Sequence, residues 1–147
     1  MNILFVCHGN ICRSPMGEFI LKDLVSKRDL GHIFGRIESC AVSREEIGNE
    51  VYPPARAELS RHGISCKGKR ARQLTFHDYE EFDYILVMDK SNLRLANYIL
   101  GDSRMDKVRM LLDRDVADPW YTGDFSQTYN DILEGCENLI VELSSKI

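Results

Sequence analysis

The sequence predicts an α/β fold in which a mostly parallel sheet is covered by helices on both faces of a single domain. Short, continuous apolar segments of strand length alternate along the chain with segments of helical periodicity. The chain has 147 residues, the size of one domain, and its 44% hydrophobic and 29% charged residues are typical of a globular protein. Because parallel strands joined by helices require right-handed crossovers, helices are expected on both sides of the sheet.

A strand and a helix open the chain. Residues Ile3–Cys7 are almost all apolar, which is typical of a short strand buried on both faces. From Pro15 to about residue 28, apolar residues recur at steps of three and four, so a helix is predicted there. Ser14 directly precedes Pro15, and this pair fits an N-cap followed by proline at the first helical position.

The same alternation continues through the middle of the chain. A second strand is expected over residues 37–42, and a second helix over residues 54–62, where Gly63 ends it. Thr75 is followed three residues later by the acid Asp78, which is the pattern of a helix start.

The second half adds two more strands and two more helices. A third buried strand is predicted over residues 83–88, and the helix that follows covers residues 89–100. A fourth strand is expected over residues 108–112. Residues 113–124 are acidic and contain proline, so they predict an irregular loop, whereas residues 125–146 have the apolar periodicity of a long amphipathic helix.

Composition and charge exclude several classes of protein. A formal net charge of −4 is too acidic for a general nucleic-acid binder. No apolar run approaches the roughly 20 residues that span a bilayer, and the first residues lack the basic flank of a signal peptide. We therefore expect a cytoplasmic protein with neither nucleic acid nor membrane as a partner.

The cysteines and histidines favour neither a disulfide framework nor a metal site. The five cysteines include no Cys-x-x-Cys pair, and the four histidines show no spacing typical of metal ligands. Free thiols and no metal or other cofactor are therefore expected. Cys40, Cys66 and Cys136 fall within apolar patterns and are expected to act as small buried hydrophobic residues.

The segment after the first strand carries the strongest chemical signal, and it reads Cys7-His-Gly-Asn-Ile-Cys-Arg13-Ser14-Pro15. Gly9 and Asn10 tolerate unusual backbone angles and can turn successive N–H groups inward as an anion nest. The next helix points its positive end at the same place, and Arg13 adds a planar fork of donors. These fields favour a thiolate at Cys7, so the segment predicts a cysteine nucleophile at the bottom of an oxyanion-binding loop.

At this point the chain resembles the low-molecular-weight protein tyrosine phosphatases. The resemblance lies in the Cys-x5-Arg-Ser-Pro segment near the N-terminus, with Gly-Asn-Ile-Cys inside it, and it runs almost end to end. Further matching segments are Glu46-Ile-Gly-Asn49, Arg61-His-Gly-Ile64, Ala71-Arg-Gln73, Asp83-Tyr-Ile-Leu86, Met88-Asp89, Ser91-Asn-Leu-Arg94 and Asp118-Pro-Trp-Tyr121. It implies that residues 1–147 form one phosphatase domain, a three-layer sandwich with a central four-stranded parallel sheet.

The resemblance also implies a two-step hydrolysis of phosphotyrosine through a cysteinyl-phosphate. Cys7 would attack phosphorus while Arg13 and the loop amides hold the phosphate oxygens. Asp118 would protonate the leaving oxygen and then activate the water that cleaves the intermediate. The position of Asp118 agrees with this, because it follows the fourth strand, at the same sheet edge as Cys7, and Pro119 restrains its backbone.

Supporting roles follow from the same resemblance. Ser14 would hydrogen-bond the sulfur of Cys7, and Asp89 would orient Arg13. Asn10 would fix the conformation of the loop with help from Ser39. The residues of the loop expected to line the phosphate site are His8, which is placed at its rim, Gly9, Asn10, Ile11, Cys12 and Ser14.

The resemblance also places residues around the mouth of the pocket. Trp120 and Tyr121 match the aromatic residues that wall the pocket, where a phosphotyrosine protein or a small aryl phosphate would bind and release phosphate. Glu45 stands on the opposite wall, where the family often has an aromatic residue, so weaker stacking and repulsion of acidic peptides are expected. Lys69 replaces a common histidine of the family.

Three other functions use parts of the same pattern. Related enzymes that remove phosphate from arginine carry threonine where this chain has Ile11, which favours a phosphotyrosine ester. Arsenate reductases share the loop but need further cysteines after the middle of the chain, and residues 67–135 contain none. A module that only binds phosphate would need neither Cys7 nor Asp118.

Two local features keep more than one interpretation. Cys12 is either core filling or the residue that traps an oxidised Cys7 in a disulfide, as the resemblance implies. The basic residues within 67–72 are expected to form a solvated loop, with attraction of phosphorylated substrates as the second interpretation and contact with nucleic acid as a distant third.

Overall fold

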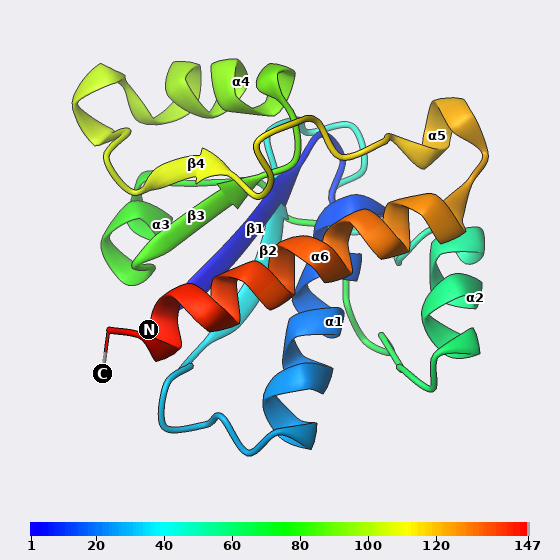
Figure 1. Ribbon diagram of the computed structural model, residues 1–147. Coiled ribbons are helices and arrows are strands. Elements are labelled where there is room, and N and C mark those ends of the chain that lie inside the picture. Colours follow the sequence, from blue (N-terminus) through cyan, green and yellow to red (C-terminus); the bar gives the residue numbers. More distant parts are fainter. Residues whose placement is uncertain (147) are drawn as a thin grey trace.

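The computed structural model describes residues 1–146 and contains one sheet of four parallel strands in the order β2-β1-β3-β4 (Figure 1). The strands are β1 (Ile3–Cys7), β2 (Ile37–Ala41), β3 (Tyr84–Val87) and β4 (Val108–Met110). The four predicted strands are confirmed, and their ends differ from the predicted ends by no more than two residues. Because β1 pairs with both β2 and β3, Cys7 leaves the sheet near its centre.

Helices cover both faces of this sheet, which confirms the predicted three-layer arrangement. They are α1 (Arg13–Lys27), α2 (Pro53–Arg61), α3 (Phe76–Glu81), α4 (Lys90–Leu100), α5 (Pro119–Thr122) and α6 (Phe125–Ser144), with a 3₁₀ turn over Asp102–Arg104. Figure 1 shows α1 and α6 against one face, and α3 and α4 against the other.

Two hydrophobic clusters lie on opposite faces of the sheet, and the residues of β1 contribute alternately to one and the other. Ile3 and Phe5 point toward α1 and α6, whereas Leu4 and Val6 point toward α3 and α4, because successive strand side chains face opposite sides. All four side chains are fully buried. Gly17 allows α1 to lie directly on this strand, since a Cβ there would stand 2.7 Å from the ring of Phe5.

The start of α1 differs from the predicted one. The helix begins at Arg13 with Cys12 at its N-cap, so Ser14 is not the N-cap and Pro15 is the third helical residue. The hydroxyl of Ser14 instead accepts a hydrogen bond from the side-chain amide of Asn10 at 2.7 Å and donates to the Cys40 carbonyl at 3.2 Å. The serine is therefore engaged across the loop rather than with the end of its own helix.

The segment after β4 also differs, because α5 forms where an irregular loop was predicted over residues 113–124. Asp118 is the N-cap of α5: its Oδ1 accepts a hydrogen bond from the Trp120 N–H at 3.1 Å, and Pro119 is the first helical residue. The prediction was wrong for this short helix, although an aspartate followed by proline is itself a helix-start signal.

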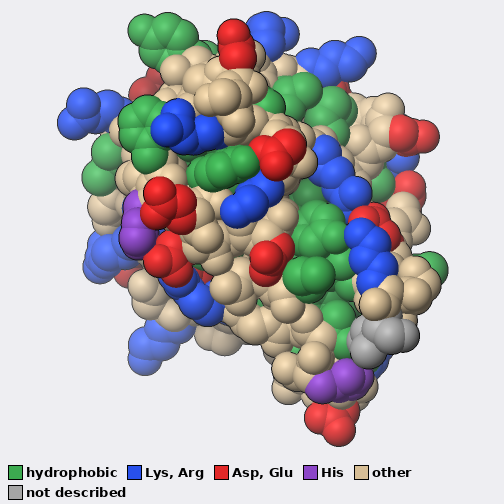
Figure 2. Space-filling view, turned by 90° about the vertical axis from the view of Figure 1, so that its left-hand side faces the viewer, with side chains coloured by type: hydrophobic (Ala, Val, Ile, Leu, Met, Phe, Trp, Pro, Cys, Tyr) green, Lys and Arg blue, Asp and Glu red, His purple; other side chains and the backbone are tan. Residues whose placement is uncertain are grey.

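β2 and β4 form the two edges of the sheet, and charged side chains lie at β4. Arg109 of this strand pairs with Glu142 of α6 at 2.7 Å. On the face shown in Figure 2, Lys and Arg side chains are interspersed with Asp and Glu side chains rather than gathered into one basic patch. Charge of this kind discourages pairing of the edge with another strand.

The carboxyl ends of the strands bring three distant segments to one edge of the sheet. Cys7 ends β1, Asp89 follows β3 closely, and Asp118 lies in the segment between β4 and α6. This is the edge at which open α/β sheets bind their ligands. In residues 1–146, no helix has the length and apolar character needed to cross a membrane.

Candidate active site

The loop between β1 and α1 forms a cradle of free backbone donors around Cys7. The N–H of Asn10 donates to the Cys7 sulfur at 3.3 Å. Within residues 1–146, the N–H groups of Gly9, Ile11 and Cys12 donate to no protein acceptor. Donors left free beside a thiol and at the start of a 15-residue helix can bind an anion, as the sequence predicted.

The guanidinium of Arg13 is buried and fixed from one side. Its Nη1 donates to Asp89 Oδ2 at 2.8 Å and to the Val116 carbonyl at 3.0 Å. Burial works to lower the pKa of Arg13, but the neighbouring Cys7 and Asp118 outweigh it and raise that pKa. The arginine is therefore a permanent cation whose orientation Asp89 sets, and the predicted contact between these two residues is present.

The sulfur of Cys7 contacts the hydroxyl of Ser14, with Sγ and Oγ 3.0 Å apart. In the thiol form the hydroxyl proton is directed to the Cys40 carbonyl at 3.2 Å. Rotation of this hydroxyl allows Ser14 to donate to a thiolate instead. The structure thus brings together the predicted pair, Cys7 and Ser14.

Asn10 holds the loop in its conformation. Its φ of 60° lies in the left-handed region, which asparagine tolerates better than most residues. The side-chain amide nitrogen donates to the hydroxyls of Ser14 at 2.7 Å and Ser39 at 3.0 Å, and its oxygen accepts from the Arg72 N–H at 3.1 Å. Because Asn10 is almost completely buried, these bonds tie the loop to α1, β2 and the segment before α3.

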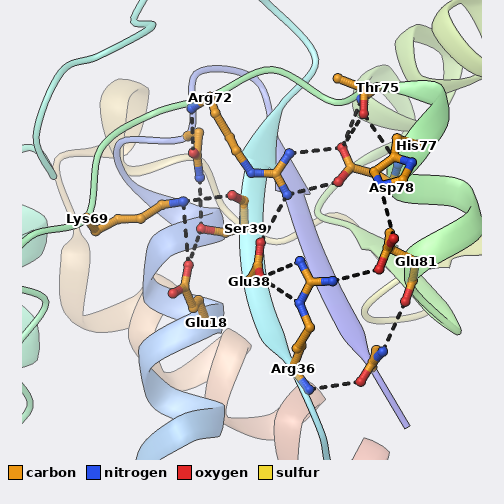
Figure 3. Close-up of polar contacts among 12 residues, drawn as sticks. Glu18, Arg36, Glu38, Ser39, Lys69, Arg72, Thr75, His77, Asp78 and Glu81 are labelled. Atoms are coloured by element: carbon orange, nitrogen blue, oxygen red, sulfur yellow. Dashed lines mark hydrogen bonds and ion pairs between the residues drawn. The ribbon is translucent and has the colours of Figure 1, made fainter.

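Ser39 is in turn bonded to a buried ion pair, Glu18 and Lys69, which was not predicted from the sequence. Its hydroxyl donates to Glu18 Oε1 at 2.6 Å, and the Nζ of Lys69 donates to the Ser39 carbonyl at 2.7 Å. Lys69 Nζ also lies 3.6 Å from Glu18 Oε1 (Figure 3). Burial lowers the pKa of Lys69, and the charge of Glu18 opposes that effect. Lys69 therefore supports the loop from behind.

The prediction of a solvated basic loop over residues 67–72 was accordingly wrong for two of its members. Lys69 is mostly buried against Glu18, and Arg72 forms a two-pronged ion pair with Asp78, with distances of 2.9 and 3.0 Å (Figure 3). Basic residues in sequence do not reveal acids that the fold places beneath them. Lys67 remains exposed, as expected.

Asp118 faces the cradle from the opposite side. Its Oδ2 lies 3.4 Å from Arg13 Nη2, while its Oδ1 accepts the Trp120 N–H. The side chain is 28% exposed, so the carboxyl group reaches the solvent side of the cradle. This position suits proton exchange with a group bound above the sulfur.

A cavity of about 480 Å³ is lined by Cys7, Arg13 and Asp118 together. Its lining includes Cys7, His8, Gly9, Ile11, Cys12, Arg13, Glu45, Glu46, Asp89, Ser91, Asn92, Asp118, Trp120 and Tyr121. His8 and Glu45 stand at the exposed rim, with His8 Nε2 and Glu45 Oε2 3.2 Å apart. Asn10, Ser14 and Ser39 lie behind the lining instead. The prediction that Asn10 and Ser14 line the phosphate site directly was therefore wrong.

Two residues in or beside this cavity were not predicted from the sequence. Glu46 was quoted only as part of a motif, yet it adds a second carboxylate beside Glu45. Tyr52 packs against Trp120, with ring centroids 5.2 Å apart, and so supports one wall. The two prolines that follow Tyr52 indicate a segment with a restricted backbone. Nothing near Tyr52 in the sequence indicates that its partner is Trp120.

The five cysteines are free and buried. Burial, aided by the charge of Cys7, raises the pKa of Cys12 to about 12. Burial also raises the pKa values of Cys40, Cys66 and Cys136, as expected for small residues inside the core. In the described residues 1–146, no group of three or more His, Cys, Asp or Glu side chains is arranged to hold a metal ion.

Comparison with known proteins supplies independent findings. A family model described as "Low molecular weight phosphotyrosine protein phosphatase" matches residues 2–147. The low molecular weight protein-tyrosine-phosphatase YfkJ of Bacillus subtilis (strain 168) is 38% identical, over 99% of this chain and 97% of that protein. The low molecular weight phosphotyrosine protein phosphatase of Homo sapiens is 37% identical, over 92% of this chain and 90% of that protein. The crystal structure of YfkJ from Bacillus subtilis matches with a TM-score of 0.94 at 37% identity, and covers 99% of this chain and 96% of that chain.

Proposed function

Because the chain belongs to the low molecular weight phosphotyrosine protein phosphatase family, it is a phosphotyrosine hydrolase that uses a cysteine nucleophile, and we propose that Cys7, Arg13 and Asp118 carry out its reaction. The observation that carries this assignment is the single cavity that all three side chains line. Residues 1–147 form one catalytic domain in this proposal.

In the first step, the thiolate of Cys7 attacks phosphorus and forms the S–P bond as the bond to the tyrosyl oxygen breaks. Asp118 gives its proton to that oxygen. The free N–H groups of the loop and the guanidinium of Arg13 hold the equatorial phosphate oxygens, where charge is concentrated. The 2.8 Å bond to Asp89 supports this role, because it fixes the guanidinium before substrate arrives.

In the second step, Asp118 is a carboxylate and takes a proton from water as the water oxygen attacks phosphorus. The S–P bond breaks, and inorganic phosphate and the Cys7 thiolate are released. The hydroxyl of Ser14, 3.0 Å from the sulfur, donates to the departing thiolate and stabilises it as a leaving group.

The cavity supports an aryl phosphate as substrate. Trp120 is 59% exposed and Tyr121 is 85% exposed, so both rings are open to stack on a phenyl ring. A phosphotyrosine protein or a small aryl phosphate therefore binds between these rings and the Glu45 side of the rim. The apolar Ile11 favours the tyrosyl ester over an arginine phosphoramidate.

We place the protein in the cytoplasm and expect neither nucleic acid nor a membrane as a partner. The net charge of −4 supports this expectation, and on the face shown in Figure 2 the basic side chains are interspersed with acidic ones. The five buried free thiols suit a reducing compartment.

A substrate panel tests the proposed function. The wild-type protein should hydrolyse phosphotyrosine peptides with a kcat/KM far above that for phosphoserine peptides and phosphoarginine, and should not reduce arsenate in the presence of thiols. A higher kcat/KM for phosphoarginine, or thiol-dependent arsenate reduction, would contradict the proposed reaction.

Replacing the carboxyl group of Asp118 tests its role as the acid. Asp118→Asn should lower kcat/KM for phenyl phosphate by about 10²–10⁴-fold, the usual contribution of a positioned general acid. The loss should be much smaller for p-nitrophenyl phosphate, whose leaving group needs little protonation. Equal losses on the two substrates would show that Asp118 is not the proton donor.

Oxidation tests the second sulfur in the cavity. Peroxide should convert Cys7 to a sulfenic acid, and the thiol of Cys12 should then displace water to form a Cys7–Cys12 disulfide. Loss of the Cys7 charge removes one cause of the raised pKa of Cys12, which favours this step. Cys12→Ser should keep its activity when reduced but recover poorly with dithiothreitol after peroxide. Equal recovery of the two proteins, measured by activity, would show that Cys12 only fills the core.

A further inference from the structure

The segment that carries Asp118 has little backbone support of its own. After β4, the Leu111 N–H bonds to the Val87 carbonyl and the Val116 N–H bonds to the Met88 carbonyl. Asp118 then begins α5, which is only 4 residues long. A general acid needs a fixed position relative to substrate, so other contacts must hold the peptide groups beside it.

Two buried polar side chains of α6 supply those contacts. The hydroxyl of Thr128 donates to the Ala117 carbonyl at 2.8 Å, and Asp131 Oδ2 accepts from the Ala117 N–H at 3.4 Å. The distance from Thr128 Oγ1 to the Asp124 carbonyl is longer, 3.3 Å, so the single hydroxyl proton belongs to Ala117. Both backbone groups of Ala117 are thereby bound to one face of one helix.

These side chains are buried as core residues are. Thr128 is 0% exposed and Asp131 is 5% exposed. A buried polar group costs free energy unless it has a partner, and the partners of this pair lie in the segment before Asp118. Asp131 also accepts from Gln127 at 2.8 Å and lies 3.3 Å from Arg114, so its second oxygen is satisfied by its own helix and by the same segment.

The hydrogen bond from Thr128 restrains the peptide group that directly precedes Asp118. The Ala117 carbonyl belongs to the peptide unit that ends at the Asp118 nitrogen, so fixing it restrains the backbone of Asp118 from one side. Pro119 restrains the same residue from the other side. The direction of the Asp118 side chain is then set before substrate binds.

We propose that Thr128 and Asp131 are positioning residues that aim the carboxyl group of Asp118 into the active-site cavity through the backbone of Ala117. The inference rests on the proposed function, in which Asp118 is the general acid. Neither side chain lines the cavity, so neither touches the substrate.

Thr128→Val tests the proposal, because valine keeps the shape of threonine and removes the hydroxyl. We expect kcat/KM for phenyl phosphate to fall about tenfold, within the range for a misplaced catalytic group. The kcat/KM for p-nitrophenyl phosphate and the inhibition constant of vanadate should change less than about twofold, since the Cys7–Arg13 loop is untouched. Thr128→Ser restores the hydroxyl and should restore the activity on phenyl phosphate.

Asp131→Asn provides a second variant should the valine variant fail to fold. It should show the same dependence on leaving group, whereas Asp113→Asn, in the same segment but 97% exposed on its side chain, should behave as wild type. In the Asp118→Asn background, adding Thr128→Val or Asp131→Asn should not lower kcat/KM for phenyl phosphate further. The general acid is already absent in that background, so its position no longer affects the rate.

The outcomes separate the inference from the function on which it rests. Equal losses on both substrates, weaker vanadate inhibition, or an undiminished loss in the Asp118→Asn background would make Thr128 and Asp131 merely structural. If Asp118→Asn itself shows no dependence on leaving group, the assignment of the acid fails first. Wild-type kinetics in both folded α6 variants, with Asp118→Asn impaired, would overturn the positioning role alone.

Discussion

Cys7→Ser should abolish turnover while leaving oxyanion binding in place. The hydroxyl of serine is a much weaker nucleophile than a thiolate, and the loop field that favours a thiolate at Cys7 is not enough to deprotonate a serine hydroxyl. The binding of vanadate or phosphate depends instead on the free loop N–H groups and on Arg13, which this change leaves intact. We expect no measurable release of phosphate from a phosphotyrosine peptide.

Thermal denaturation with and without vanadate checks the second half of this expectation. The anion should raise the melting temperature of Cys7→Ser, because any ligand that binds only the folded state stabilises it. Cys40→Ser is a suitable control, since Cys40 is buried behind the loop and does not line the cavity. Substantial residual turnover in Cys7→Ser would remove Cys7 from the role of nucleophile.

Arg13→Lys should have the second largest effect, with a loss of kcat/KM of about 10²–10³-fold or more, the range for removing one preorganised donor to a developing charge. Lysine keeps the positive charge but is a point charge, so it cannot bind Asp89 and two phosphate oxygens at once. Because the single ammonium group of lysine cannot reproduce the several donors of the guanidinium, the bond to the Val116 carbonyl should also be lost.

The pattern of loss distinguishes Arg13 from Cys7. Arg13→Lys should weaken vanadate inhibition and reduce the thermal shift caused by vanadate as well as turnover, whereas Cys7→Ser should lose turnover and keep the thermal shift. Arg44→Lys, an exchange at an exposed arginine outside the cavity, serves as the matched control and should leave these quantities unchanged. Unaltered vanadate inhibition in Arg13→Lys would contradict the role of the guanidinium as an oxyanion clamp.

The local signals in the sequence were sufficient for the strands and for the catalytic loop. The apolar run of β1 and the Gly-Asn turn are neighbours in sequence, so the cradle around Cys7 could be predicted without a structure. The meeting of Cys7 with Asp118 followed from topology, because parallel strands end at the same edge of the sheet. The early start of α1 was missed because Ser14 bonds to Asn10 instead of capping the helix.

The supporting residues could not be predicted, because their partners are distant in sequence. Glu18 on α1 and Lys69 after α2 are unremarkable charges on their own, and only the fold places them against Ser39. Thr128 and Asp131 read as polar positions on an amphipathic helix, yet both are buried. Hydrophobic periodicity identifies which face of a helix is buried, but it does not identify the buried polar exceptions.

Direct detection of the phosphoenzyme tests the central claim, that Cys7 forms a cysteinyl-phosphate. Asp118→Asn is the suitable protein and p-nitrophenyl phosphate the suitable substrate, because this leaving group needs no acid while hydrolysis of the intermediate still lacks its base. After rapid acid quenching, mass spectrometry should find one phosphoryl group per protein, located on Cys7, with a matching burst of nitrophenol. A burst of nitrophenol with the phosphoryl group on another residue, or with none attached, would contradict the account.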